Sequence, residues 1–471
     1  MRGYNGGEVG DKTMSKKITT KEMTEGPLIR PIIRYTVPII LSSVLQLLFN
    51  AADLVVVGQF GSENSVGAVG ATSSLTNLMV NLFLGLSVGA GVVVAHGLGA
   101  KDDEKVRQTV HTSIPLAVIC GAFLTVIGIF LSGPILGLMG TPQENLPLAT
   151  LYMQIYFCGM IFNLLLNFGS SILRAAGDST GPMKYLTIAG VVNVVLNLVF
   201  VIVFKMDVAG VALATIIAQV VSATLIMRAL MKRTDACKLK LRELGIHRKP
   251  LKRILAIGIP SGIQSSLFSI SNVLMQSSMF SFGPVALKGV SAASNIEGFI
   301  YVLMHSFNQT MVNFTGQNEG ARKYRRIAKL YFTCLWMMLV ISVTLCGAVY
   351  LCGRPLLSIY IPGDAAAIEF GMQRLLMVGL LYFLCGMMEI ASGGARGMGI
   401  SLSTTLVNVI GVCGLRVVWI YTVFPKFHTL TALYTSYSLS WVVTYLATSF
   451  IFFGVLRTRR KRYEKELLQT A

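Results

Sequence analysis

Long apolar segments dominate this sequence and limit the folds that it can adopt. About 20 consecutive apolar residues are enough for an α-helix to cross a lipid bilayer. Twelve segments of this kind lie at roughly residues 32–60, 66–98, 109–139, 148–173, 184–204, 208–231, 252–283, 289–316, 327–353, 367–394, 402–424 and 430–456. Only 13% of the residues are charged, whereas soluble domains contain about 25%. We therefore expect an all-α membrane protein with 12 transmembrane helices.

The basic residues between these segments predict how the chain is oriented. Of its 40 Lys and Arg residues, 34 lie on one side of the predicted helices and four on the other. Cytoplasmic loops of membrane proteins are enriched in Lys and Arg. We therefore expect a multi-pass protein of the plasma membrane (the inner membrane of the cell) with both termini in the cytoplasm. Because the net charge of +19 comes from these loops, it does not indicate a nucleic-acid partner.

The two halves of the chain repeat each other at an offset of about 222 residues. The matched pairs include Pro38 and Pro260, Asn50 and Asn272, Gly67 and Gly289, Arg174 and Arg396, and Gly177 and Gly399. Six spans return the chain to the side where it began, so the repeats are parallel and form two lobes around a central cavity. The expected parts are a tail (1–26), an N-lobe (27–231), a basic cytoplasmic linker (232–251), a C-lobe (252–456) and a basic tail (457–471).

Asp53 stands out in the N-lobe because it lies within a predicted membrane helix. A carboxylate near the bilayer centre costs at least about 2.5–3.5 kcal/mol, which a bound cation, a proton or a polar pocket must offset. Gln46, Asn50 and Asp53 follow the spacing i, i+4 and i+7 and share one helix face. Asn193 and Asn197 form a second pair at i, i+4. These groups supply oxygens for Na⁺ or a carboxylate for a proton; alternatively, they only hold helices together.

Two further acidic residues, Glu297 and Glu389, lie within predicted C-lobe helices. We expect Glu389 to contact a cationic substrate or a second ion; the alternative is a buried ion pair with Arg396 or Arg374. For Glu297, a functional role and a capping or packing role stay open. The helix at 252–283 also carries a polar stripe that is expected to line the substrate path, formed by Ser265, Ser269, Asn272 and Gln276.

Motifs of other protein classes carry little weight in this sequence. GLSVG at 85–89 matches the serine-hydrolase elbow, but that elbow requires a strand, a turn and a helix, and here it lies in a membrane span. The five His residues lack metal-ligand spacing, the eight Cys residues form no CxxC pair, and there is no P-loop for ATP. We therefore expect no enzyme activity and no cofactor, with an ion gradient as the energy source.

Four short stretches resemble the MATE (multidrug and toxic compound extrusion) transporters of the prokaryotic type. These stretches are FNAADLVVVGQFG at 49–61, TGQNEGARKYRR at 315–326, LRAAGDS at 173–179 and ARGMGIS at 395–401. The first resembles the acid-containing first helix of the family, the second its GQN-x-GA basic loop, and the last two its paired Arg-Gly loops. The resemblance covers roughly residues 26–456.

The resemblance implies a V-shaped pair of six-helix lobes and a cation site in the N-lobe. Asp53 matches the first-helix acid of this site, Asn193 matches an Asn of the fifth helix, and Thr215 lies at the spacing of a threonine of the site. Asn197 stands where many members carry a second Asp. In the C-lobe, Gln264 falls close to the position of a seventh-helix Glu.

The same resemblance gives a role to the helix prolines. Bending of the first helix at Pro38 would link occupancy of Asp53 to the shape of the cavity. Pro260 is the repeat partner of Pro38.

The function expected from these observations is secondary active multidrug export. A monomer would exchange amphipathic or cationic organic compounds for H⁺ or Na⁺ by alternating access, with Na⁺ possible at Asp53. The first alternative is a flippase for lipid-linked sugars of the same broad superfamily, which would favour a cationic cavity and commonly 14 spans. The second is an intramembrane enzyme, for which the sequence offers no catalytic constellation.

Overall fold

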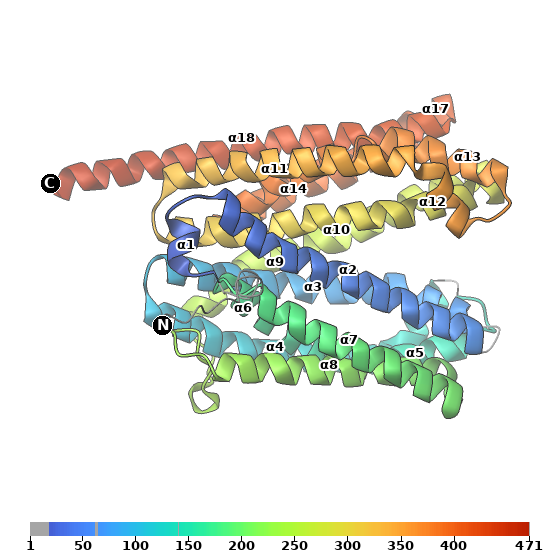
Figure 1. Cartoon of the computed structure of the whole chain (residues 1–471), viewed down its shortest axis with the longest axis horizontal. Helices are drawn as coiled ribbons and strands as arrows, with labels where there is room; N and C mark the ends of the chain where they lie inside the picture. Colours follow the sequence, from blue (N-terminus) through green and yellow to red (C-terminus); the bar gives the residue numbers. More distant parts are fainter. Residues whose placement is uncertain (1–17, 62–64, 140, 471) are drawn as a thin grey trace, which may run out of the picture.

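The computed structural model describes residues 18–61, 65–139 and 141–470. Within these residues every regular element is helical, and the long helices lie side by side (Figure 1). The first half contains α1 (Thr20–Thr24), α2 (Ile29–Phe60), α3 (Ser65–Gly99), α4 (Asp103–Leu138), α5 (Leu146–Cys158), α6 (Met160–Ala175), α7 (Thr180–Leu198) and α8 (Asp207–Met231). The second half contains α9 (Arg248–Met279), α10 (Pro284–Gly320), α11 (Tyr324–Leu351), α12 (Gly353–Tyr360), α13 (Ala365–Arg374), α14 (Phe383–Gly397), α15 (Ser401–Asn408), α16 (Leu415–Thr422), α17 (Phe424–Phe427) and α18 (Leu430–Thr470). The all-α prediction is confirmed.

Eleven of the twelve predicted spans coincide with candidate membrane helices. Among the described residues, nine helices are long and apolar enough to cross a membrane, or eleven if each of two bent helix pairs forms one span. The predicted span 289–316 corresponds to α10, which has 37 residues but is too polar to be counted with the other eleven. Most of its polar side chains are buried against other helices of the molecule, which explains why it can be polar in an apolar bundle.

The internal repeat is visible in the backbone. The pair α5 and α6 is bent by 50°, and the pair formed by Ala365–Gly379 and α14 is bent by 42° at the equivalent position. Gly177 and Gly399 both have positive φ, at 84° and 79°. A β-carbon on Gly177 would also lie 2.0 Å from the Ile18 carbonyl oxygen, so both the conformation and the close approach require glycine there.

The C-terminal basic segment is helical rather than an irregular tail. The helix α18 continues past the predicted span to Thr470. On it, Arg460 donates to Glu464 one turn later at 2.9 Å, a spacing that supports helices. Arg322, in the turn between α10 and α11, reaches Glu466 at 2.8 Å. The helix α9 begins at Arg248, within the last residues of the predicted linker 232–251.

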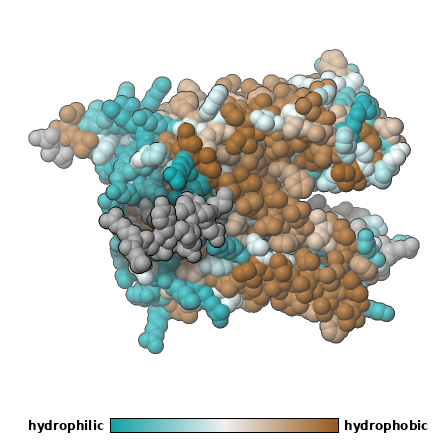
Figure 2. Space-filling model, in the orientation of Figure 1, coloured by the Kyte–Doolittle hydropathy of each residue, from teal (hydrophilic) through white to brown (hydrophobic). Residues whose placement is uncertain are grey.

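The two lobes contact each other near one end of the molecule. The hydroxyls of Thr36 and Thr310 lie 2.8 Å apart, and Arg174 Nη1 donates to Gln309 Oε1 at 2.6 Å. Further along, the helices α3 and α9 pack backbone to backbone, because a β-carbon on Gly85 would lie 2.2 Å from the Gly262 nitrogen. Hydrophilic residues gather at the α1 end, and a hollow separates the lobes at the opposite end (Figure 2).

The short helix α1 bridges the lobes at this hydrophilic end. On the N-lobe side, the Ile18 amide donates to the Gly177 carbonyl at 3.2 Å. On the C-lobe side, Asn318 Nδ2 donates to the Met23 carbonyl at 3.1 Å. Lys323 adds an ion pair to Glu25 at 3.0 Å. Residues 18–26 therefore connect both lobes in this conformation.

Candidate functional site

The N-lobe contains a polar network that joins three helices. Asn197 on α7 donates through Nδ2 to the Asp53 carboxylate on α2. The same nitrogen lies 3.4 Å from Asn193 Oδ1, and Asn193 Nδ2 donates to Thr215 Oγ1 on α8 at 3.4 Å. The structure thus brings together four of the five residues predicted for coupling, in one chain of hydrogen bonds.

Two members of the predicted stripe on α2 do not join this network. Gln46 and Asn50 are exposed, and neither side chain has a hydrogen bond to another described residue. They share a helix face with Asp53, but α7 supplies its polar groups only at the level of Asp53. Of the stripe predicted from the spacing, only Asp53 therefore belongs to the hydrogen-bond network.

The network could hold a hard cation or a proton, because its free groups are oxygens. Asn197 is fully buried, and its Oδ1 has no hydrogen-bond partner among the described residues. A buried acceptor without a partner is costly unless a ligand satisfies it. The described residues contain no group of three or more His, Cys, Asp or Glu that could hold a metal ion. With a single carboxylate, the network suits a monovalent ion or a proton better than a divalent metal ion.

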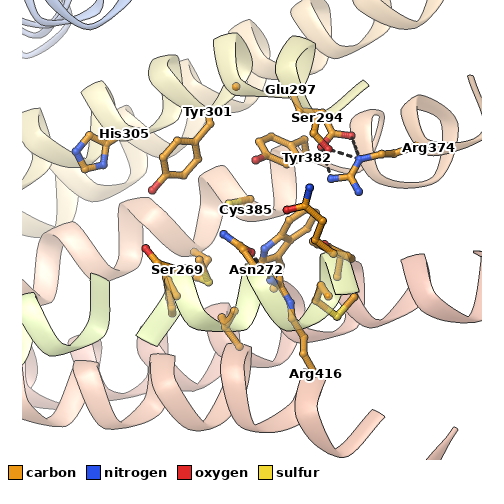
Figure 3. A pocket seen from close by; sticks show the side chains of 18 of the residues that line it. Ser269, Asn272, Ser294, Glu297, Tyr301, His305, Arg374, Tyr382, Cys385 and Arg416 are labelled. Atoms are coloured by element: carbon orange, nitrogen blue, oxygen red, sulfur yellow. Dashed lines mark hydrogen bonds and ion pairs between the residues drawn. The ribbon is translucent and has the colours of Figure 1, made fainter. Parts of the chain in front are cut away.

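A cavity of about 660 Å³ lies among the C-lobe helices, with Asn81 of α3 also on its wall. The predicted stripe on α9 lines it with Ser265, Ser269, Asn272 and Gln276. Figure 3 shows Ser269 and Asn272 on one wall, with Tyr301 and Glu297 opposite them. Aromatic and sulfur-containing side chains complete the lining, including Phe268, Met275, Met279, Met388 and Trp441. Such a surface adapts to apolar ligands of different shapes.

Glu297 on α10 forms a buried ion pair with Arg374 on α13 at the wall of this cavity (Figure 3). Arg374 donates from Nε to Glu297 Oε1 at 3.0 Å and from Nη2 to Oε2 at 2.7 Å. Both side chains are less than 10% exposed. An ion pair with Arg374 was not among the roles expected for Glu297, and the choice between a functional role and a capping or packing role stays open. Because Arg374 pairs with Glu297, it is not the ion-pair partner of Glu389.

Glu389 on α14 lines the cavity without an ion pair. It is buried, and its carboxylate has no hydrogen bond or salt bridge to a described residue. Arg396 attracts it electrostatically from beyond salt-bridge distance. The backbone of α14 is held at this point, because Asn308 Nδ2 donates to the Glu389 carbonyl at 2.7 Å.

Arg416 is the cavity residue to which the sequence gave no role. Its guanidinium lies 4.2 Å from the centre of the Tyr437 ring and 5.9 Å from that of Trp441. It also donates to Ser440 Oγ at 3.2 Å and to Asn272 Oδ1 at 3.4 Å. The available signal was an arginine inside a predicted membrane span, which by itself marks a functional candidate.

Comparison with known proteins now identifies the family. The sequence profile of the MatE family matches residues 38–199 and 260–422. The chain belongs to the MatE family. The two matches begin at the paired prolines, Pro38 and Pro260, so each covers one half of the repeat.

Other MatE proteins are similar along most of their length. The chain is 26% identical to "Probable multidrug resistance protein YoeA" of Bacillus subtilis over 86% of this chain and 89% of the relative. It is 25% identical to "Probable multidrug resistance protein NorM" of Thermotoga maritima over 82% and 84%. Among solved structures, a MOP superfamily transporter from Pyrococcus furiosus, described as having a binding pocket of reverse polarity, superposes with a TM-score of 0.88 at 21% identity, covering 94% of this chain and 99% of that one. An outward-facing MATE family transporter gives 0.87 at 22%, covering 95% and 100%. These likenesses establish the two-lobe fold.

Three predicted residues of this MatE protein remain to be placed. Gln264 lies elsewhere than expected, and the role predicted for Pro38 and Pro260 stays untested. Gln264 does not line the cavity; it accepts a hydrogen bond from Thr405 Oγ1 at 3.4 Å between α9 and α15. It points away because it precedes the cavity-lining stripe by one residue, which is about 100° around the helix. Pro38 and Pro260 lie inside α2 and α9, and both helices continue through them. Bending at these prolines stays a prediction.

Proposed function

We propose that this protein is a secondary active multidrug exporter that exchanges amphipathic or cationic organic compounds for H⁺ or Na⁺. Its MatE relatives carry the names "Probable multidrug resistance protein" and "Multidrug export protein". The observation that carries the proposal is the combination of two sites in one bundle. One is the single-carboxylate network around Asp53 in the N-lobe, and the other is the adaptable cavity in the C-lobe.

The proposed transport cycle is alternating access between two lobe arrangements. The basic end faces the cytoplasm of a plasma-membrane protein under the positive-inside rule. The lobe contacts near this end, such as Thr36 with Thr310, then close the cytoplasmic side. The hollow between the lobes at the other end (Figure 2) would face outward, so this arrangement is the one that releases drug and takes up the coupling ion.

The network around Asp53 supplies a route from ion binding to helix movement. A charged Asp53 accepts the hydrogen bond of Asn197. A protonated Asp53 keeps one acceptor oxygen and gains an O–H donor, and a turn of the Asn197 amide would bring its Oδ1, which has no partner at present, to that O–H. Turning the amide in this way would break its contact with Asn193. Bound Na⁺ would likewise compete for Asp53 and Asn197 Oδ1. Either event would loosen α2 from α7, which favours a second arrangement of the lobes.

The flippase alternative receives no support from the charges of the cavity. A site for lipid-linked sugars would favour a cationic wall, whereas this cavity carries two Glu and two Arg residues. We propose that the protein acts as a monomer, since both sites lie within one chain. No nucleic-acid partner and no cofactor other than the coupling ion is proposed.

The test uses the purified protein in proteoliposomes. Uptake of a fluorescent organic cation is followed under an imposed H⁺ gradient, an imposed Na⁺ gradient, or neither, with protein-free liposomes as the control. The proposal predicts gradient-dependent accumulation with one of the two ions. Equal uptake in all three conditions, or none above that of the empty liposomes, would refute it.

A further inference from the structure

The charges that line the C-lobe cavity are not all neutralised by one another. Four charged side chains reach the cavity: Glu297, Arg374, Glu389 and Arg416. Glu297 and Arg374 neutralise each other through a bidentate ion pair. This leaves one acidic and one basic side chain in the same cavity without an ion-pair partner among the described residues.

The basic group, Arg416, is held in place entirely by neutral partners. It is 3% exposed, lies over Tyr437 and Trp441, and donates to Ser440 and Asn272. Its Nη2 makes no hydrogen bond to a described residue. A guanidinium offers five N–H donors in a planar fork that matches a carboxylate. Because only Nε and Nη1 donate hydrogen bonds, the Nη2 side of the guanidinium is available to bind a ligand at the cavity wall.

A comparison inside the same cavity shows what Arg416 lacks. Arg374 lies over the same Tyr437 ring, at 5.6 Å from its centre, but it also has the carboxylate of Glu297 at 2.7 Å. Burying a charge without an opposite charge is costly. An anionic group of a ligand would neutralise the buried charge of Arg416, as Glu297 neutralises that of Arg374.

The acidic group, Glu389, lacks a positively charged ion-pair partner among the described residues. It is 7% exposed, lines the cavity, and forms no ion pair with a described residue. A cationic group of a ligand would neutralise it. The cavity wall also includes Phe268, Met275 and Met388, which suits a ligand with an apolar or aromatic body.

We propose that the C-lobe cavity binds zwitterionic amphipathic compounds, with a carboxylate of the ligand on Arg416 and its cationic group near Glu389. This inference rests on the proposed export function in one respect, which is that the C-lobe cavity is the substrate site. It narrows the substrate class from organic cations to compounds that also carry an acid. The residue that sets this preference is Arg416.

The test compares two probes that differ in this one group: tetramethylrhodamine, whose free carboxylate makes it a zwitterion, and its methyl ester, which is a cation. Binding of each probe to the purified full-length protein is measured by fluorescence anisotropy. The wild type is expected to bind the free acid at least about tenfold more tightly than Arg416→Gln does, because charge-assisted hydrogen bonds are lost. Binding of the ester should change less than about twofold between these proteins. Glu389→Gln should weaken the binding of both probes.

Two further variants keep the result interpretable. Arg354→Gln removes an arginine of the same charge that is exposed on α12 and paired with Glu369, and it should bind both probes as the wild type does. Arg416→Lys keeps the charge without the fork and should give an intermediate affinity for the acid. If Arg416→Gln does not fold, the Lys variant and the wild-type preference for acid over ester decide the question. An equal loss for both probes, or no loss for either, overturns the inference.

Transport of the same probes separates this inference from the proposed function. If both probes are exported and Arg416 has no effect on acid binding, the inference is wrong and the exporter assignment is retained. If the acid binds through Arg416 but neither probe moves under a gradient, the binding preference is correct and the exporter assignment is wrong.

Discussion

Asn197 donates a hydrogen bond to Asp53 and thereby joins α7 to α2. The donor is fully buried, and the acceptor is the carboxylate of the N-lobe network. An amide at this position leaves Asp53 as the single acid of that network. We therefore propose that the site exchanges one proton or holds one monovalent cation.

Replacing Asn197 should lower the stability of the folded protein. Asn197→Ala removes the donor and leaves a buried carboxylate with less support, which should lower the free energy of unfolding by about 1–3 kcal/mol. Asn167→Ala is the matched control, because among the described residues the Asn167 side chain bonds only to Asn163 on its own helix. It should cost less than about 1 kcal/mol. Thermal unfolding in detergent compares them; equal losses would show that the contact with Asp53 has no special weight.

The ion pair between Glu297 and Arg374 should behave as a buried pair. Removing one partner, in Glu297→Gln, leaves an uncompensated guanidinium and should destabilise the protein by about 3–5 kcal/mol. The double variant with Arg374→Gln should recover part of this loss. The exposed pair Arg354–Glu369 is the control, and breaking it should cost at most about 1 kcal/mol. A double-mutant cycle measures the coupling, and coupling no larger than that of the exposed pair would contradict the prediction.

Packing between the lobes should depend on Gly85. In Gly85→Ala the new β-carbon would overlap the α9 backbone, at 2.2 Å from the Gly262 nitrogen. The lobes should then separate where α3 packs on α9, which distance measurements between spin labels on these two helices would detect as an increase. Gly347→Ala on α11 is the control, because its β-carbon would meet nothing within 4 Å. Unchanged distances in Gly85→Ala would show that the helices can adjust.

Attachment of α1 should depend on pH through Glu25. The hydrogen bond and charge of Lys323 lower the pKa of Glu25 below its ordinary value of 4.5. Because the folded-state pKa is lowered, the contact stabilises α1 fully above that ordinary value and is lost as the pH falls through the lowered one. Amide exchange at residues 20–25, corrected for intrinsic rates, should therefore accelerate at low pH. Lys323→Gln should reduce the pH effect and Arg325→Gln should not. A smaller effect should remain from Glu22 of the same helix, whose pKa is also lowered, against desolvation by burial, by its hydrogen bonds with Thr19 and Arg34. A pH effect of undiminished size in Lys323→Gln would exclude the ion pair with Glu25 as a cause.

The sequence predicted the fold well because bilayer crossing and repetition leave clear patterns. Apolar length located eleven candidate spans, and the 222-residue offset paired Gly177 with Gly399, which both have positive φ in the structure. The span at α10 was also predicted from apolar length, although it is more polar than the others because many of its polar side chains are buried among other helices. What escaped prediction depends on side-chain direction. One residue along α9 separates Gln264, between helices, from Ser265, on the cavity wall.

The partners of the charged residues could not be read from spacing. The sequence offered Arg374 or Arg396 as the alternative ion-pair partner of Glu389, whereas in the structure Arg374 forms its ion pair with Glu297. Such pairings depend on how α10 and α13 meet in space, and no local pattern encodes that contact. Arg416 was visible as a charge in a span, but its ring partners, Tyr437 and Trp441, lie on another helix.

The central claim is that Asp53 couples the ion gradient to transport. The most direct measurement compares the wild type with Asp53→Asn in proteoliposomes by two assays: gradient-driven accumulation of a fluorescent cation, and exchange of the same compound across the membrane without a gradient. The account predicts that Asp53→Asn loses accumulation and keeps exchange within about a factor of two of the wild type, since roughly that change corresponds to less than 0.5 kcal/mol. Accumulation that persists in Asp53→Asn under the same gradient would contradict it and would move the coupling role to Glu389.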